Sequence, residues 1–216
     1  MYCVLLTSDV IGSKKIKNLD SILQNKINDL NLKFEKDLLT KISSSRGDEI
    51  QFILKLNNSF FENIMTFRAV LYPIIVRTGA SIVKITELNI GNLSNSWDLN
   101  GEPFFLARKI LDEDLKKIKI YTLKFDSNIE KYDNIFNSFF ILNDAILNNW
   151  KKIHWELIKI ALEYDYDNKE ISKKLGLYSE GSNKPTQTYY DRLKKTNISS
   201  IKESYNYIIN EFQLKE

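Results

Sequence analysis

The stretch ISSSRGDEIQFIL, residues 42–54, consists of two short strand-like segments separated by Gly47 and Asp48. Glycine supplies a positive φ and aspartate tolerates turn conformations, so this pair predicts the turn of a β-hairpin. The acidic pair at the tip, Asp48 and Glu49, leaves two interpretations open. Asp48 is either an ordinary turn residue or a side chain held over a binding cleft. Glu49 is expected to face solvent or Arg46, and a role as a third metal ligand is the alternative.

Strand and helix patterns alternate on both sides of this hairpin. Before it, YCVLLTS (2–8) has the pattern of a buried strand, and apolar residues at helical spacing predict a long helix from Leu19 to Leu39. After it we expect a helix that begins at Ser59 and ends at Pro73, a strand at 74–85, a helix at 103–115, a strand at 119–125 and a helix at 127–149. This order favours a ferredoxin-like βαββαβ arrangement with an antiparallel sheet, both helices on one face, and a trailing helix.

The rest of the chain has helical patterns and no strand signal. Two of them, NKEISKKLGLY (168–178) and PTQTYYDRLKK (185–195), resemble a helix-turn-helix with Gly176 at the turn, which SEGSNK (179–184) lengthens. The predicted class is therefore α+β, with two domains: a ferredoxin-like domain at 1–149 and an all-α helix-turn-helix domain at 150–216.

Composition excludes several kinds of chemistry. The 216 residues carry 31 Lys and Arg against 28 Asp and Glu, so any nucleic-acid site must be a local patch. There is one cysteine, Cys3, and one histidine, His154, which leaves out intramolecular disulfides and zinc sites built on several Cys or His ligands. No apolar run approaches the roughly 18–20 residues of a transmembrane helix, and we expect a cytoplasmic protein that does not enter a membrane.

Two acidic residues fall at the ends of strands that are expected to be neighbours. Asp9 ends the first strand and Asp48 begins the hairpin, so their carboxylates can converge at one edge of the sheet. Carboxylates suit Mg²⁺ or Mn²⁺, which prefer oxygen ligands and can clamp a nucleoside triphosphate. Backbone N–H groups near Gly12 and Ser13, together with Lys14, can hold phosphate oxygens if a helix follows.

Four motifs, in order, resemble those of class III nucleotidyl cyclases. TSDVIGS (7–13) is similar to their first metal-binding strand, and RGDEI (46–50) to the Gly-Asp hairpin with the second ligand. RTGASIV (77–83) is similar to the strand after the second helix, and WDLNGEPFFLAR (97–108) to the Asp-x-x-Gly segment and the Arg-bearing helix. The resemblance implies that Asp9 and Asp48 are metal ligands, that Asp98 contacts the base, and that Arg108 is a catalytic residue at the phosphates.

More closely, DVIGSKK, RGDEIQ, LYPIIVRTGAS and NGEPFFLARKI, followed by a helix-turn-helix, resemble the SatD family of bacterial proteins. This resemblance implies a cyclase-like half and a tail that binds DNA. The chain departs from the cyclases at Ser44, where they carry a base-reading Lys, and at Phe104 and Phe105, where they carry an Asn. Losing one transition-state stabiliser typically costs about 10²–10³ in rate. We therefore expect metal-nucleotide binding to be retained better than cyclisation.

Basic side chains surround Thr and Gln in the third helical pattern of the tail, a mixture that suits contacts to phosphates and base edges. The residues expected to bind DNA are Lys184, Gln187, Arg192, Lys194 and Lys195. The alternative is a small helical bundle with solvated lysines. Two other predicted roles also have alternatives, because Asp98 suits an Asx-turn and Arg108 suits an i,i+4 pair with Asp112.

Three functions remain open from the sequence. The first is a regulator in which the cyclase-like domain binds a nucleotide with Mg²⁺ or Mn²⁺ and biases the DNA-binding tail. The second is an active nucleotidyl cyclase that makes a cyclic nucleotide. The third is a DNA-binding or interaction protein whose cyclase-like domain is degenerate. Because cyclases have their sites at a dimer interface, the resemblance also implies a homodimer.

Overall fold

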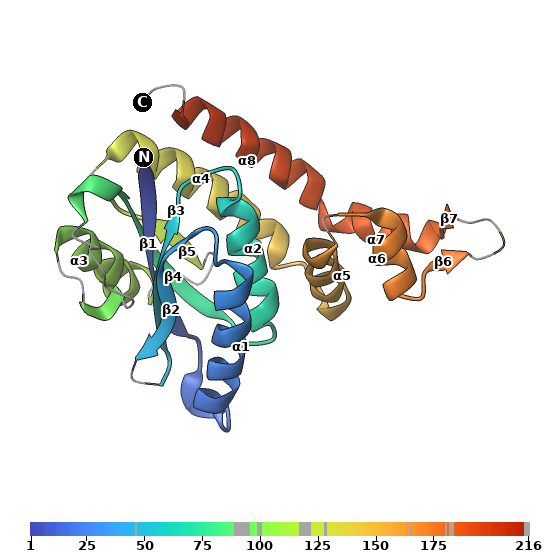
Figure 1. Ribbon diagram of the computed structural model, residues 1–216, viewed down its shortest axis with the longest axis horizontal. Coiled ribbons are helices and arrows are strands. Elements are labelled where there is room, and N and C mark those ends of the chain that lie inside the picture. Colours follow the sequence, from blue (N-terminus) through green and yellow to red (C-terminus); the bar gives the residue numbers. More distant parts are fainter. Residues whose placement is uncertain are drawn as a thin grey trace.

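The computed structural model describes residues 1–45, 47–88, 96–98, 101–116, 122–127, 129–164, 166–179, 181 and 184–213. Within these ranges the protein belongs to the mixed α+β class, as predicted. A five-stranded sheet has helices on both faces, and a group of further helices extends away from it (Figure 1). No helix among these residues is long and apolar enough to cross a membrane.

The sheet has the strand order β2-β3-β1-β4-β5. Its strands are β1 (Tyr2–Val10), β2 (Leu38–Ser45), β3 (Glu49–Lys55), β4 (Val76–Lys84) and β5 (Leu123–Phe125). β1 pairs antiparallel with both β3 and β4, β2 pairs antiparallel with β3, and β5 runs parallel to β4. The first and third strands therefore lie side by side, as expected, and the ends of β1, β3 and β4 meet at one edge.

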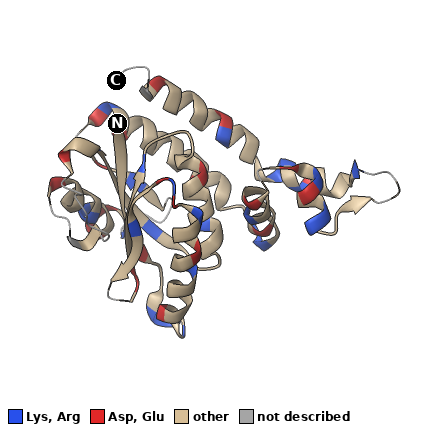
Figure 2. Cartoon of the chain, in the orientation of Figure 1, with Lys and Arg blue, Asp and Glu red and all other residues tan. Residues whose placement is uncertain are grey.

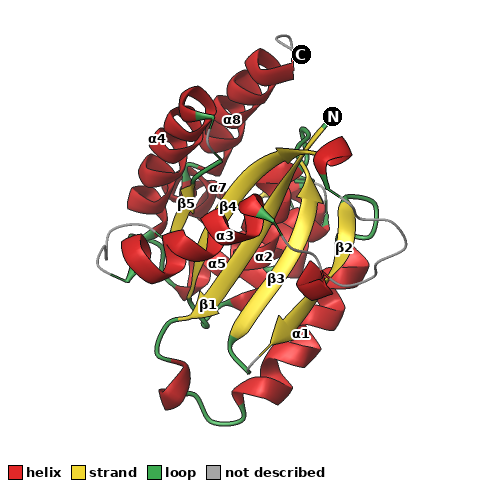
Figure 3. Cartoon of the chain, turned by 90° about the vertical axis from the view of Figure 1, so that its left-hand side faces the viewer, coloured by secondary structure: helices red, strands yellow, loops and turns green. Residues whose placement is uncertain are grey.

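Alternate residues of the central strand serve different layers, because successive strand side chains point to opposite faces. Val4 and Leu6 belong to the main core, whereas Cys3 and Leu5 belong to a smaller cluster on the other face. The main core is covered by α1 (Leu19–Lys33), α2 (Phe60–Leu71) and α4 (Glu130–Leu147). The opposite face is covered by α3 (Glu102–Lys109), which continues as the π-helical segment η4 (Ile110–Leu115) and lies across the sheet in Figure 3.

Cys3 is fully buried and is one of the residues that this second layer covers. Burial raises the pKa of its thiol to about 12, so the group is protonated at neutral pH. Since the thiolate is the nucleophilic form of cysteine, this side chain serves the core rather than chemistry.

The first helix is shorter than predicted. α1 ends at Lys33, and the Asp37 and Leu38 amides donate to the carbonyl of Phe34 in the turn that follows. Leu38 and Leu39 therefore lie in β2 and not in the helix. Two adjacent leucines satisfy both a helical and a strand pattern, and here pairing of Leu38 with Leu54 of β3 prevails.

Two other predicted elements also differ. Ser59 precedes α2 as expected, but its side chain makes no capping hydrogen bond. The strand predicted at 119–125 is present as β5 from Leu123, while 117–121 lie outside the described residues.

The tail is not all-α as predicted. Its helices are α5 (Lys152–Glu163), α6 (Asn168–Lys174), α7 (Gln187–Thr196) and α8 (Ile198–Gln213). Between α6 and α7 lies a two-stranded antiparallel ribbon, β6 (Tyr178–Ser179) and β7 (Lys184–Pro185), with Tyr178 opposite Pro185. Strands of two residues carry no alternating pattern, so the sequence signal was only the polar loop between them. α6 and α7 are therefore joined through a ribbon rather than a short turn.

The last helix runs back from α7 toward the sheet (Figure 1). α8 packs on α2 and α4, where Tyr205 stacks on Phe61 at 5.6 Å between ring centroids. Phe212 lies edge-on to Tyr2, at 5.1 Å. One apolar cluster therefore contains residues from both predicted domains, 1–149 and 150–216, and their division near residue 150 stays a prediction.

Candidate functional site

Three charged side chains form a row at the edge where β1 ends. In the strand register, Asp9 of β1 lies opposite Glu49 of β3 on one side and opposite Arg77 of β4 on the other. Residues directly opposite each other in antiparallel strands have Cβ atoms about 4.5–5.5 Å apart. All three are only partly exposed, at 21% for the Asp9 side chain and 13% for that of Glu49. Two carboxylates and one guanidinium therefore share a half-buried surface.

Asp9 is held by Arg77 through both of its carboxylate oxygens. The Nε of Arg77 donates to Oδ1 at 3.0 Å, and Nη2 donates to Oδ2 at 2.5 Å. Such a two-point contact between guanidinium and carboxylate is a strong and directional ion pair. The first predicted metal ligand thus already has a cationic partner within the same chain.

Arg108 is held between two carboxylates from different elements. Its Nη1 donates to Glu49 at 2.6 Å, and its Nε donates to Asp112 at 3.1 Å. The hydrogen bond with Glu49, followed by that with Asp112, raises the pKa of Arg108 above its ordinary value. Asp112 also accepts from Lys116 at 2.7 Å, and chiefly this bond lowers the pKa of Asp112. The i,i+4 pair with Asp112 is therefore present, but Arg108 also reaches the sheet.

Close packing of α3 on β4 positions Arg108. At Gly79 an added Cβ would lie 2.0 Å from the carbonyl oxygen of Ala107, so the helix rests directly on the strand backbone. Ala107 is fully buried there, and the next residue, Arg108, lies at the margin with a 39% exposed side chain. We call Asp9, Glu49, Arg77, Arg108 and Asp112 the edge cluster.

Glu49 is the member whose role the sequence prediction missed. It does not face solvent as expected, and Arg46, the other expected partner, lies outside the described residues. The position of Glu49 could have been predicted from the alternation of side chains in EIQFIL. Ile50 and Phe52 belong to the main core on one face of the sheet, so Glu49 lies on the opposite face.

The hairpin turn itself matches its prediction. Gly47 has a φ of 80°, which favours glycine, and an added Cβ there would lie 2.6 Å from a carboxylate oxygen of Asp20. The carbonyl of Asp48 accepts a hydrogen bond from the amide of Val10 at 3.1 Å. Asp48 is partly exposed and lies at the same edge as Asp9.

A divalent ion resident on Asp9 does not fit this arrangement. Both oxygens of Asp9 are bonded to Arg77, and Glu49 is bonded to Arg108. In the part of the chain that the structure describes, no group of three or more His, Cys, Asp or Glu side chains is placed to hold a metal. Mg²⁺ is usually held by one or two carboxylates together with waters and phosphates, so an ion on Asp9 would first have to break the ion pair with Arg77. Metal binding by Asp48, the other predicted ligand, stays a prediction.

The predicted phosphate-binding segment has a different local structure from the expected one. Gly12, with a φ of 72°, precedes η1 (Ser13–Lys15), a single turn of 3₁₀ helix, and α1 begins only at Leu19. Gly12 and Lys14 are exposed and Ser13 is partly exposed. Phosphate binding by these residues stays a prediction, without the support of an α-helix that begins at Ser13.

Asp98 lies in the 3₁₀ segment η3 (Ser96–Asp98), next to β2 and β3. Its side chain lies outside what the structure describes, so neither its predicted contact with a base nor an Asx-turn is tested.

The residues predicted to bind DNA lie on and beside α7. Lys184 is in β7, and Gln187, which donates to Asp191 at 2.9 Å, begins the helix. Lys184, Gln187 and Lys194 are exposed, and Figure 2 shows basic positions distributed over α6 and α7.

Lys195 is also exposed and Arg192 is partly exposed, and α7 packs on α5. Burial lowers the pKa of His154 in α5, and the charge of Lys195, and then of Lys151 and Arg192, lowers it further. DNA binding by these five residues stays a prediction. Thr186 caps the helix by accepting from the amide of Tyr189, whose buried ring fixes α7 to Asn168 of α6.

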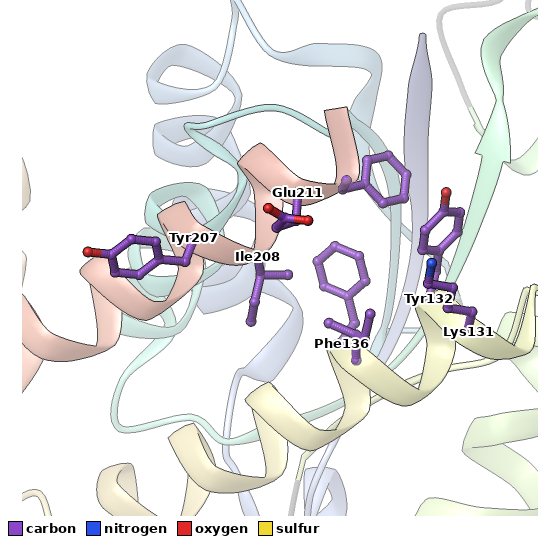
Figure 4. Close-up of a pocket in the computed structure, with 8 residues that line it drawn as sticks. Lys131, Tyr132, Phe136, Tyr207, Ile208 and Glu211 are labelled. Atoms are coloured by element: carbon purple, nitrogen blue, oxygen red, sulfur yellow. The ribbon is translucent and has the colours of Figure 1, made fainter. Parts of the chain in front are cut away.

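An apolar groove lies between α4 and α8 (Figure 4). Tyr132 and Phe136 contribute from α4, and Tyr207 and Ile208 from α8, with Lys131 and Glu211 at its rims. Nothing in the structure shows what covers this groove, and the predicted homodimer stays a prediction.

A family model described as the SatD family matches residues 2–203. The chain belongs to the SatD family. The match covers the sheet, the edge cluster and most of the tail of this SatD-family protein, so both parts are family features. No match was found among curated proteins or among solved structures. The similarity to class III nucleotidyl cyclases stays a prediction.

Proposed function

We propose that this SatD-family protein is a regulator that binds a nucleotide at the edge cluster and DNA through its tail. The order β2-β3-β1-β4 supports the first part, because it is the order of a ferredoxin-like sheet, on which a cyclase-like site would lie at this edge. The observation that carries the proposal is Arg108, a partly exposed guanidinium held at that edge by Glu49 and Asp112.

Arg108 would bind the phosphates of the nucleotide. Its planar fork matches phosphate oxygens, and its charge persists at all working pH values. The loop after β1 lies at the same edge, since the Ile11 amide donates to Ile75 just before β4. That loop brings Lys14 as a second, exposed cation. In binding, phosphate oxygens would replace carboxylate oxygens as acceptors for Arg108.

The tail would bind DNA through the exposed side of α7. Lys184 and Lys194 supply charge for phosphates, and Gln187 supplies an amide that can read a base edge. Buried Tyr189 holds α7 against α6, which gives the helix the fixed orientation that groove contacts need.

α8 is the element that would couple the two sites. It follows α7 after Asn197 and packs on α2 and α4 beside the sheet. A nucleotide can change DNA affinity only if it binds two conformations of the protein with different affinity. A shift of α8 relative to the sheet would provide those two conformations.

A second candidate is a DNA-binding protein whose cyclase-like domain is degenerate. The two-point ion pair between Asp9 and Arg77 favours it, because that pair occupies the carboxylate that a cyclase would use for metal.

The test is thermal stabilisation by each nucleoside triphosphate, with EDTA and separately with Mn²⁺. We expect one nucleotide to raise the melting temperature, and Arg108→Ala to abolish this effect. Lys109→Ala is the matched control, since Lys109 is the exposed neighbour on the same helix and is expected to keep the response. No response to any nucleotide, with DNA binding intact, would establish the second candidate. Release of pyrophosphate would instead identify a cyclase.

A further inference from the structure

We infer that Arg77 is a built-in cation for Asp9, so that the edge cluster takes up its nucleotide without a divalent ion on that carboxylate. The part about the ligand rests on the proposed nucleotide site. The part about the metal rests on the structure of the cluster alone.

The strand register places two carboxylates next to each other, and their repulsion has to be relieved. Asp9 and Glu49 are opposite each other on neighbouring strands, and like charges in that position repel. A divalent ion between the two carboxylates would be one way to relieve the repulsion. The chain uses another way: Arg77 neutralises Asp9 from the β4 side, and Arg108 neutralises Glu49 from the α3 side.

Arg77 is fixed more firmly than a surface arginine. It belongs to β4, whose residues from Val76 to Lys84 pair with β1, and its side chain is only 20% exposed. Both nitrogens that face Asp9 are at hydrogen-bonding distance. The guanidinium therefore occupies the position beside Asp9 through the strand register, not through a flexible contact.

A metal ion on Asp9 would have to displace this partner and remain beside its charge. Charges a few ångströms apart interact strongly at a protein surface, and a divalent ion doubles the repulsion. Arg77 thus determines specificity: it excludes the divalent ion and leaves Asp9 neutralised. The anionic phosphates then meet Arg108 without a metal on Asp9 to balance their charge.

Mn²⁺ alone, detected by electron paramagnetic resonance, tests the metal part directly. We expect the wild-type protein to leave the free Mn²⁺ signal unchanged, and Arg77→Gln to bind Mn²⁺ about tenfold more tightly or better. Adding Asp9→Asn to Arg77→Gln should remove the gained binding, and Arg77→Lys, which keeps a cation, should not gain it. Melting curves establish that each variant is folded.

The Mn²⁺ titration of the wild-type protein tests the inference even if Arg77→Gln fails to fold. Binding of Mn²⁺ by the wild type that Asp9→Asn abolishes would overturn it. For the ligand part, nucleotide affinity in EDTA should lie within about twofold of that in Mn²⁺, and a tenfold gain with Mn²⁺ that depends on Asp9 would also overturn it. If no nucleotide binds in either buffer, the proposed function fails, while the Mn²⁺ titration still decides the role of Arg77.

Discussion

The hydroxyl of Tyr205, in the last helix, donates a 2.9 Å hydrogen bond to the carbonyl of Asn57, in the loop between β3 and α2. The Tyr205 ring is fully buried among Phe60, Phe61 and Phe139, and this burial raises its pKa well above the ordinary value. Tyr205 therefore anchors the tail to α2, α4 and the loop before α2, in addition to the contact of Phe212 with Tyr2.

Removing this anchor should destabilise the whole protein. Tyr205→Phe loses one buried hydrogen bond and should cost about 0.5–1.5 kcal/mol, whereas Tyr205→Ala also opens a cavity and should cost about 3–5 kcal/mol. Urea unfolding followed by circular dichroism measures both. Tyr207→Ala on the same helix is the control, since Tyr207 is 67% exposed. Equal losses for Tyr205→Ala and Tyr207→Ala would contradict the anchor.

A buried ion pair joins α2 to α4. Arg68 donates to Asp144 at 2.6 Å, with side-chain exposures of only 11% and 3%, and Asp144 also accepts from the Thr122 amide. Asp144→Ala leaves Arg68 without its carboxylate and should lower the free energy of unfolding by about 3–5 kcal/mol. Glu156→Ala removes an exposed partner of Lys152 and should change it by about 0.5 kcal/mol or less. A similar loss for both variants would show that the Arg68 pair is not stabilising.

DNA binding by α7 should depend on salt in a way that individual lysines control. Lys194→Ala and Lys184→Ala should each weaken binding to all sequences and reduce the slope of log affinity against log salt by about 1. Lys152→Ala, an exposed lysine on α5, should leave the slope unchanged. Fluorescence anisotropy at several salt concentrations measures these slopes. Unchanged slopes in all three variants would favour the helical bundle with solvated lysines.

His154 should titrate below its ordinary pKa. Its Nδ1 accepts the amide of Lys151 at 3.1 Å, and burial, Lys195 and Arg192 disfavour its charged form. The folded state then binds fewer protons than the unfolded state, so this contribution to stability is full above about pH 6.5 and is lost as the pH falls through the folded pKa.

The titration of His154 can be followed directly by proton NMR, because the chain has a single histidine and its Hε1 signal needs no assignment among several imidazoles. We expect a midpoint below about 6.5, and an upward shift of that midpoint in Lys195→Met. His154→Asn keeps an acceptor for the Lys151 amide and should remove this part of the pH dependence. A midpoint at or above the ordinary value would contradict the assignment.

The strands with strong patterns and the pairing of β1 with β3 could be predicted from sequence, whereas the side-chain partners that meet across the sheet could not. YCVLLTS and EIQFIL are apolar enough to require a central position, so the pairing of β1 with β3 followed. Nothing local relates Arg77 to Asp9, because they meet only through the register of β1 and β4. The metal prediction considered Asp9 and Asp48 and not Arg77, the cation that the register places beside Asp9.

Short elements could not be predicted from the sequence for a different reason. A strand of two residues, as in β6 and β7, buries too little to leave a hydrophobic period, so only tertiary pairing defines it. The position of Glu49 could have been predicted from the alternation in β3, but its partner Arg108 lies in a helix far along the chain.

The return of α8 to the sheet has a consequence for how the chain reaches its native state. All five strands leave the ribosome before α8, yet the aromatic surface that Tyr205 and Phe212 cover lies on the sheet side of the molecule. Until α8 has been synthesised, the nascent sheet domain exposes an apolar surface. Such surfaces make incompletely folded chains prone to aggregate unless chaperones bind them. Completion of the fold is therefore a late, long-range event, and a ribosome stalled before Tyr205 would hold an unfinished core.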